Sequence, residues 1–192
     1  MAIYLIRHGW TAANEKHLYC GATDLPLSER GVSGVEELKG QGVYPTCVDL
    51  RFTSGMTRTE QTLDIICGQT GRTAIPELAE YNFGDFEMQG YDQLKVRGDY
   101  QAWIADQTGL IACPGGESRQ RFERRVLAGF GQLLEKSKGA RSVLAVCHGG
   151  TIATIMESLN PGQRNFYEWR PSPGRGYMLV YEGGELCQYK EV

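Results

Sequence analysis

The stretch "SVLAVCHGGTIATIMESL", residues 142–159, contains the clearest structural signal of the chain. A mostly apolar run over 142–147 is followed by His148 and two glycines, and then by apolar residues at helical spacing. A short apolar run of this kind is typical of a strand buried on both faces, as in a parallel sheet. The stretch therefore predicts a strand that leads directly into a helix, with a histidine at the carboxyl end of the strand.

The start of the chain repeats this arrangement. In "AIYLIRHG", residues 2–9, an apolar run ends at Arg7 and His8, and a glycine follows. The carboxyl ends of parallel strands line the ligand crevice of α/β sheets, and glycine lets the backbone approach a ligand closely. We therefore expect His8 and His148 to lie in one site. The positive charge of Arg7 at the same place indicates that this site binds an anion.

The remaining chain alternates strand and helix signals, which is typical of an α/β domain. We predict a helix after Ser28, a suitable N-cap, a strand over 47–52, a helix over 55–69, a short strand over 73–76, a helix over 117–138 and a final hairpin of 176–182 and 186–190 across two glycines. The pattern predicts one domain, 1–192, with three α/β/α layers and a mostly parallel central sheet. Residues 77–115 show no clear period, and we interpret them as an inserted loop and helical cap.

Composition excludes several classes of function. The 20 Lys and Arg residues against 23 Asp and Glu residues give a formal charge of -3, which offers no general attraction to nucleic acid or to a membrane surface. The six cysteines form no C-x-x-C pair, so we expect reduced thiols, a cytoplasmic location and no metal site. A small molecule is the expected partner.

A second arginine supports an anion site. In "RFTSGMTRTEQT", residues 51–62, Arg58 lies in the first turns of the helix that follows the second predicted strand. Helix N-termini favour anions, and a guanidinium group binds phosphate oxygens through paired hydrogen bonds. Arg58 is therefore a candidate phosphate ligand, although an arginine at this place on a helix is also common at protein surfaces.

The ordered motifs resemble those of the histidine phosphatase superfamily, also called the phosphoglycerate mutase-like family. They are "RHGWTAAN" (7–14), "GATDLPLSERG" (21–31), "TSGMTRTEQT" (53–62), "LAEYNFGDFE" (78–87), "PGGES" (114–118) and "CHGGTI" (147–152). The resemblance covers nearly the whole chain and implies the phosphoglycerate mutase-like fold for a single histidine phosphatase domain.

The resemblance also implies a role for each motif residue. His8 would attack phosphorus and form a phosphohistidine, while Arg7, Arg58 and His148 stabilise the phosphoryl oxygens. The implied proton donor is Glu80, with Glu77 and Glu87 as the competing carboxylates of that segment. The remaining implied contacts are Asn14 and Gly149 for the phosphate, and Thr11, Gly21 and Thr23 for the substrate. No cofactor is implied, and we interpret His17 as a surface residue.

The activity implied by the resemblance is hydrolysis of a phosphate monoester. Within the superfamily the chain looks most like the alpha-ribazole phosphatases of cobalamin biosynthesis, which makes alpha-ribazole 5'-phosphate the expected substrate. The alternatives are a phosphoglycerate mutase, a broad-specificity sugar-phosphate phosphatase, or an inactive binding module on the same fold. An aromatic ligand would fit stacking by Trp10, Tyr19, Phe86, Trp103 or Trp169, although such residues commonly lie in a core.

Three residues depart from the family pattern, and one of them suggests a rival interpretation. Cys147 and Ala153 stand where relatives often carry serine and arginine, and Trp10 stands where they commonly carry glutamate. Cys147 would suit a cysteine-dependent phosphatase, whose loop needs C-x5-R. The sixth residue after Cys147 is Ala153, so the required arginine is missing, and we expect Cys147 to be a packed core residue.

Overall fold

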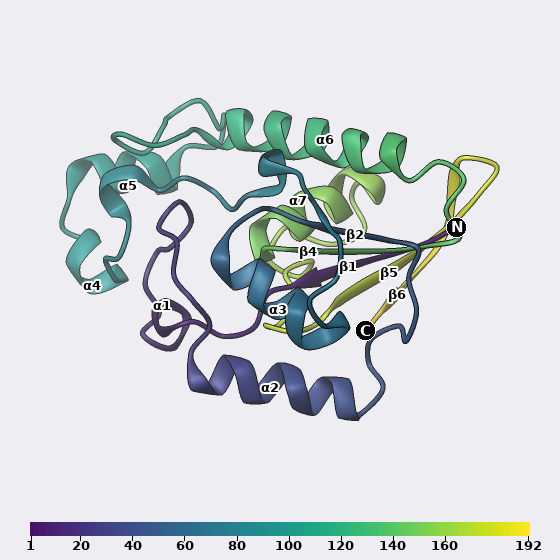
Figure 1. Cartoon of the computed structure of the whole chain (residues 1–192). Coiled ribbons are helices and arrows are strands. Elements are labelled where there is room, and N and C mark those ends of the chain that lie inside the picture. The colour runs from purple at the N-terminus through teal and green to yellow at the C-terminus, as the bar shows by residue number, and fades with distance from the viewer.

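The computed structural model describes all residues, 1–192, and is built on one six-stranded sheet (Figure 1). The strand order is β3-β2-β4-β1-β5-β6. The strands are β1 (Ala2–Arg7), β2 (Leu50–Thr53), β3 (Thr73–Ala74), β4 (Ser142–Cys147), β5 (Gly176–Glu182) and β6 (Glu185–Glu191). The first four are parallel, whereas β5 runs antiparallel to β1 and β6 antiparallel to β5. The prediction of a mostly parallel sheet is confirmed.

Helices cover both faces of this sheet (Figure 1). Helices α2 (Glu29–Gly40) and α3 (Thr57–Cys67) lie on one face, and α6 (Arg119–Lys136) and α7 (Gly149–Leu159) lie on the other. The Ser28 side chain caps α2 by accepting a hydrogen bond from the Gly31 N–H. The predicted three-layer α/β/α architecture is therefore confirmed.

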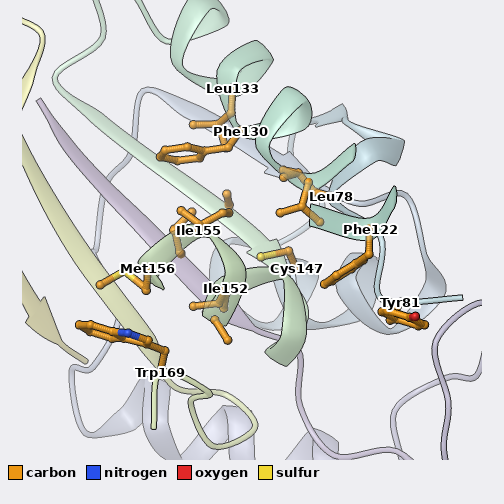
Figure 2. Close-up of a cluster of buried hydrophobic side chains, with 14 of the residues drawn as sticks. Leu78, Tyr81, Phe122, Phe130, Leu133, Cys147, Ile152, Ile155, Met156 and Trp169 are labelled. Atoms are coloured by element: carbon orange, nitrogen blue, oxygen red, sulfur yellow. The ribbon is translucent and has the colours of Figure 1, made fainter. Parts of the chain in front are cut away.

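The buried strand β4 divides the core into two parts. Val143, Ala145 and Cys147 join the larger cluster under α6 and α7, whereas Leu144 and Val146 join the cluster under α2 and α3. Figure 2 shows the larger cluster, in which side chains of α6 and α7 meet over the sheet. Because both faces of β4 are buried, its sequence is a continuous apolar run rather than an alternating one.

The segment 77–115 lies beyond the carboxyl ends of the strands (Figure 1). It contains most of the short 3-10 turn η1 (Pro76–Leu78), the turn η2 (Gly84–Phe86) and the helices α4 (Tyr91–Leu94) and α5 (Gly98–Ala105). The single-turn helix α1 (Ala12–Glu15) lies at the same end of the sheet. We call the segment 77–115 the cap.

Several predicted boundaries are wrong by two or three residues. The third strand ends at Ala74, not at residue 76, and the helix predicted over 55–69 spans 57–67. The second strand begins at Leu50, not at residue 47. Asp49 prevents an earlier start, since its side chain accepts hydrogen bonds from the N–H groups of Arg141 and Ser142, where β4 begins. The predicted final hairpin is present, and Gly183 and Gly184 form its turn with φ values of 61° and 93°. No helix of the structure has the length and apolar character needed to cross a membrane.

Candidate active site

The pairing of β1 with β4 brings the two strand-end histidines together. Arg7 is opposite Cys147 in this parallel pair, so His8 and His148 leave neighbouring strands at the same level. Their ring centroids lie 5.2 Å apart with an interplanar angle of 65°. His8 is 4% exposed and His148 is fully buried. The sheet register thus joins two residues that are distant in sequence.

The His8 ring is held in one tautomer. Its Nδ1 atom lies 2.7 Å from the Gly9 carbonyl oxygen, which can only accept, so Nδ1 carries the hydrogen and Nε2 has a free lone pair. Burial lowers the pKa of His8 well below its ordinary value, and the neighbouring cations Arg58 and Arg7 lower it further. His8 is therefore a neutral imidazole with an available nitrogen nucleophile.

A chain of hydrogen bonds fixes the second histidine. The Arg58 Nε–H donates to His148 Nδ1 at 3.3 Å, so Nε2 carries the hydrogen and donates to Ser54 Oγ at 2.8 Å. Thr59 donates its hydroxyl hydrogen to the Met56 carbonyl, which leaves its oxygen to accept from Ser54. Ser54 follows β2, so three neighbouring strands contribute to the site.

These histidines predict a loss of stability in mildly acidic solution. Burial lowers the pKa of both His8 and His148 well below 6.5 in the folded state, whereas the unfolded chain protonates them near 6.5. Below about pH 6.5 the unfolded state therefore binds up to two additional protons, and the free energy of unfolding falls by up to about 2.7 kcal/mol per pH unit; above it, neither histidine contributes. Urea unfolding at several pH values measures this slope.

The matched controls are His148→Gln and His17→Asn. His17 is exposed with a φ of 53°, which asparagine tolerates. His148→Gln should reduce the slope between about pH 6.5 and 5.5 by about half, and His17→Asn should leave it unchanged. A wild-type stability that does not change over this interval contradicts the prediction.

Arg58 anchors the loop that follows Cys20. Its guanidinium donates from Nη1 to the Thr23 carbonyl at 2.9 Å and from Nη2 to the Gly21 carbonyl at 2.7 Å. Asp24 lies 3.8 Å from Nη1, and Arg58 itself is 1% exposed. The carbonyl oxygens of Gly21 and Thr23 thus accept hydrogen bonds from Arg58, the arginine predicted to bind phosphate.

Glu87, which competed with Glu80 for the role of acid, holds the other side of this loop. Its carboxylate accepts hydrogen bonds from the backbone N–H groups of Gly21, Ala22, Thr23 and Phe83, at 2.9 to 3.2 Å. With both of its oxygens occupied by backbone donors, Glu87 positions the loop and, through it, Arg58.

Glu80 lies at the amino end of α7, close enough to Arg7 to raise the pKa of that guanidinium. Its Oε2 accepts from the Gly150 N–H at 2.9 Å and its Oε1 accepts from the Tyr81 N–H at 3.0 Å. The residue is 9% exposed. A side chain at position 150 would collide with this carboxylate, which explains the second glycine of the pair.

Arg125 of α6 holds the segment that carries Glu80. Its Nη1 donates to the carbonyls of Glu77 and Ala79, and its Nη2 donates to the Glu80 carbonyl at 3.1 Å and to Glu117 Oε1 at 2.6 Å. The Thr151 hydroxyl is a second donor to the Ala79 carbonyl, at 3.1 Å. Arg125 and Thr151 therefore hold the backbone of the candidate acid.

Arg7 and Gly149 lie beside each other. Arg7 donates from Nη1 to the Pro171 carbonyl at 2.8 Å, while its buried Nε has no partner. Burial, reinforced by the nearby Arg170, lowers the pKa of Arg7 to about 10. A Cβ atom at Gly149 would lie 3.1 Å from the Arg7 Nε, so glycine leaves room for the guanidinium. The Gly149 N–H, at the first position of α7, finds no acceptor within the helix and is suited to bind an anion, whereas the next N–H, that of Gly150, already donates to Glu80.

Asn14 and Thr11 form the cap of α1. The Asn14 Oδ1 accepts from the Thr11 N–H and from the Thr11 hydroxyl, each at 3.1 Å, and Thr11 is 1% exposed. This arrangement orients the Asn14 amide and leaves its Nδ2 hydrogens free to donate. The Thr11 hydroxyl is used in positioning Asn14.

The two glycines after the histidines serve different purposes, contrary to our expectation that both admit a ligand. A Cβ atom at Gly9 would lie 2.8 Å from the Gly31 carbonyl oxygen and 2.8 Å from Val35, so Gly9 allows α2 to pack closely. Gly149 is the one that faces cationic side chains of the site. Close packing thus accounts for Gly9, and only Gly149 remains a candidate for the approach of a ligand.

The rival cysteine mechanism does not fit the structure. Cys147 is fully buried in the larger core cluster (Figure 2), and burial raises the pKa of its thiol to about 12. A protonated, inaccessible thiol is not a nucleophile. The structure also contains no group of three or more His, Cys, Asp or Glu side chains placed to hold a metal ion.

Three of the five aromatic candidates for ligand stacking are occupied elsewhere. Phe86 and Trp169 are fully buried, and the Trp10 ring is covered by the Arg30 guanidinium at 4.0 Å on the α2 side. Tyr19 and Trp103 are half-buried and form a cluster with Phe83, with ring centroids 5.0 to 6.1 Å apart. The candidates that keep partly exposed rings are therefore Tyr19 and Trp103, which pack together with Phe83.

Sequence reasoning missed Ser54, Arg125 and Arg170. Ser54 follows a strand as the histidines do, and this position was a usable signal. Arg125 and Arg170 had no such signal, since each reaches its partners from a segment that is distant in sequence.

The chain is similar to known phosphatases and mutases. It is 32% identical over 163 residues to the adenosylcobalamin/alpha-ribazole phosphatase of Escherichia coli, covering 83% of this chain and 79% of that protein. It is also 32% identical over 173 residues to the 2,3-bisphosphoglycerate-dependent phosphoglycerate mutase of Xanthobacter autotrophicus, covering 83% and 82%.

Solved structures have the same fold. The alpha-ribazole phosphatase from Shigella flexneri superposes with a TM-score of 0.85 at 28% identity, covering 97% of this chain and 93% of that one. Phosphoglycerate mutase from Thermus thermophilus superposes with a TM-score of 0.71 at 25% identity, covering 98% of each chain. The model of the histidine phosphatase superfamily (branch 1) matches residues 3–188, and the chain belongs to this family.

Proposed function

We propose that the protein hydrolyses a small phosphate monoester through a phosphohistidine, without a metal or cofactor. The observation that carries the proposal is the His8 ring, which is neutral and held by Gly9 with Nε2 free, among buried cations. The Nε2 lone pair forms the bond to phosphorus as the bond to the leaving oxygen breaks. Glu80 gives that oxygen a proton, and the two arginines Arg7 and Arg58 stabilise the phosphoryl charge.

The second half of the reaction returns the enzyme to its starting state. Water attacks the phosphohistidine, Glu80 accepts the proton of that water, and the nitrogen–phosphorus bond breaks to release inorganic phosphate and neutral His8. The same group thus acts first as acid and then as base.

The proposed substrate is alpha-ribazole 5'-phosphate, in cobalamin biosynthesis. Its support is the half-buried aromatic cluster of Tyr19, Phe83 and Trp103 at the cap, which suits a leaving group with an aromatic ring. The higher TM-score with the alpha-ribazole phosphatase, 0.85 against 0.71 with the mutase, supports the same assignment. The net charge of -3 and six unpaired cysteines support a cytoplasmic enzyme whose partner is a small metabolite.

The second candidate is a phosphoglycerate mutase, favoured by the 32% identity to the mutase of Xanthobacter autotrophicus. A mutase would pass the phosphoryl group from His8 back to a phosphoglycerate instead of to water. The two reactions share the nucleophile and differ in the acceptor.

A pair of matched substrates tests the proposal. Alpha-ribazole 5'-phosphate and ribose 5-phosphate present the same kind of phosphoester with and without the aromatic base. Because stacking of one base contributes about 1–3 kcal/mol, we expect kcat/KM for alpha-ribazole 5'-phosphate to be about 5- to 150-fold higher, in the presence of a chelator. Equal values overturn the substrate assignment, and faster interconversion of phosphoglycerates than phosphate release establishes the mutase.

A further inference from the structure

Arg170 brings an additional cation to the candidate active site. It lies in the loop between α7 and β5, directly after the buried Trp169. A Cβ atom at Gly149 would lie 2.9 Å from the Arg170 Nε and 3.1 Å from the Arg7 Nε. The two guanidinium groups therefore meet over the first residue of α7.

The backbone of Arg170 is firmly held. Its N–H donates to the Tyr167 carbonyl at 3.2 Å, and the next carbonyl, that of Pro171, accepts from the Arg7 side chain. The preceding Trp169 is fully buried and packs against Tyr189 with ring centroids 5.5 Å apart. These contacts fix the position of the Arg170 Cα atom, from which the side chain extends toward Gly149.

The Arg170 side chain itself has no partner in the protein. It is exposed and forms no ion pair, whereas other arginines of the chain, such as Arg164 with Glu191, are paired with carboxylates. It is also close enough to His8 and Arg7 to lower the pKa of each. Two neighbouring cations repel each other, and an anion that binds between them offsets this repulsion.

No carboxylate forms an ion pair with either of these arginines, Arg7 or Arg170. Glu80 is close enough to raise the pKa of Arg7, but its two oxygens accept hydrogen bonds from backbone N–H groups and not from a guanidinium. The buried Arg7 Nε still lacks an acceptor. Two guanidinium groups thus have donors available over Gly149, beside the His8 ring.

We propose that Arg170 is a substrate-binding residue that donates, together with Arg7, to the phosphoryl oxygens of a dianionic phosphate monoester. This inference rests on the proposed function, because it assigns another ligand to the same phosphoryl group. It distinguishes Arg170 from Arg58, whose Nη1 and Nη2 each already donate one hydrogen bond to the 21–23 loop. Arg170 reaches the site from the loop between α7 and β5, and its guanidinium makes no hydrogen bond or ion pair within the protein.

The test is the binding of inorganic phosphate to the purified protein, measured by titration calorimetry, for wild type, Arg170→Ala, Arg170→Lys and Arg175→Ala. Arg175 is an exposed arginine of the same loop and serves as the matched control. We expect Arg170→Ala to weaken the phosphate Kd by about 10- to 100-fold, with a similar rise of KM and a smaller change of kcat. Arg170→Lys should restore part of the loss, and Arg175→Ala should resemble wild type.

Folding is checked in the same samples. Since the Arg170 side chain makes no ion pair, the thermal midpoint of Arg170→Ala should equal or exceed that of wild type. If wild type binds phosphate and Arg170→Ala binds it equally well, the role of Arg170 is overturned while the proposed function stands. A wild-type protein that neither binds phosphate nor releases it from an ester overturns both.

Discussion

Replacing His8 with alanine should lower kcat for any phosphate monoester by at least about 10,000-fold, the largest effect that we expect from a single substitution. Nε2 of His8 is the one nitrogen of the two histidines with a free lone pair, since Nδ1 of His8 donates a hydrogen bond to Gly9 and both nitrogens of His148 are hydrogen-bonded. Without it no covalent intermediate forms, and the arginines alone leave a small residual activity. Steady-state release of phosphate measures the loss.

The covalent intermediate provides an independent readout. Rapid acid-free quenching with radiolabelled substrate should trap a phosphorylated protein in wild type, with the acid lability of a phosphoramidate, and none in His8→Ala. His17→Asn is the matched control, because His17 is exposed and lies outside the site. A His8→Ala protein that retains more than about one tenth of wild-type kcat, or that still becomes labelled, refutes the histidine mechanism.

The strands, caps and turns that could be predicted from the sequence are those determined by a few neighbouring residues. The apolar run of β4 and its histidine are contiguous, and so are β1 and His8, so their placement follows from the rule for parallel sheets. Ser28 and the glycine pair at 183–184 similarly mark the start of α2 and the final turn by their own chemistry. Each of these elements is decided by a few neighbouring residues.

The features that the sequence did not reveal depend on contacts between distant segments. The start of β2 is set by the Asp49 side chain binding the backbone before β4, and no local preference encodes that contact. The short helices α4 and α5 lack a long amphipathic period, so 77–115 was interpreted only as a cap. Gly9 and Gly149 have the same local sequence setting, and only the packing of α2 separates their roles.

Replacing Glu80 with glutamine should lower kcat for alkyl phosphates by about 100- to 10,000-fold, but for p-nitrophenyl phosphate by less than about 10-fold. The reason is that an alkoxide leaves poorly without a proton, whereas nitrophenolate leaves unaided. The amide also loses one acceptor: only its oxygen can accept, so the N–H of either Gly150 or Tyr81 is left unpaired, at about 1–3 kcal/mol of stability. The variant is therefore expected to be less stable than wild type.

The ratio of the two activities, measured on one preparation, separates catalysis from this loss of stability. Any unfolded fraction lowers both rates by the same factor, so it cancels in the ratio, whereas removal of a general acid changes the ratio by about 10-fold or more. Glu77→Gln is the matched control, because the Glu77 carboxylate belongs to the same segment and makes no ion pair. An equal loss on both substrates would mean that Glu80 only orders the amino end of α7, and the proton would then have to come from another group or from water.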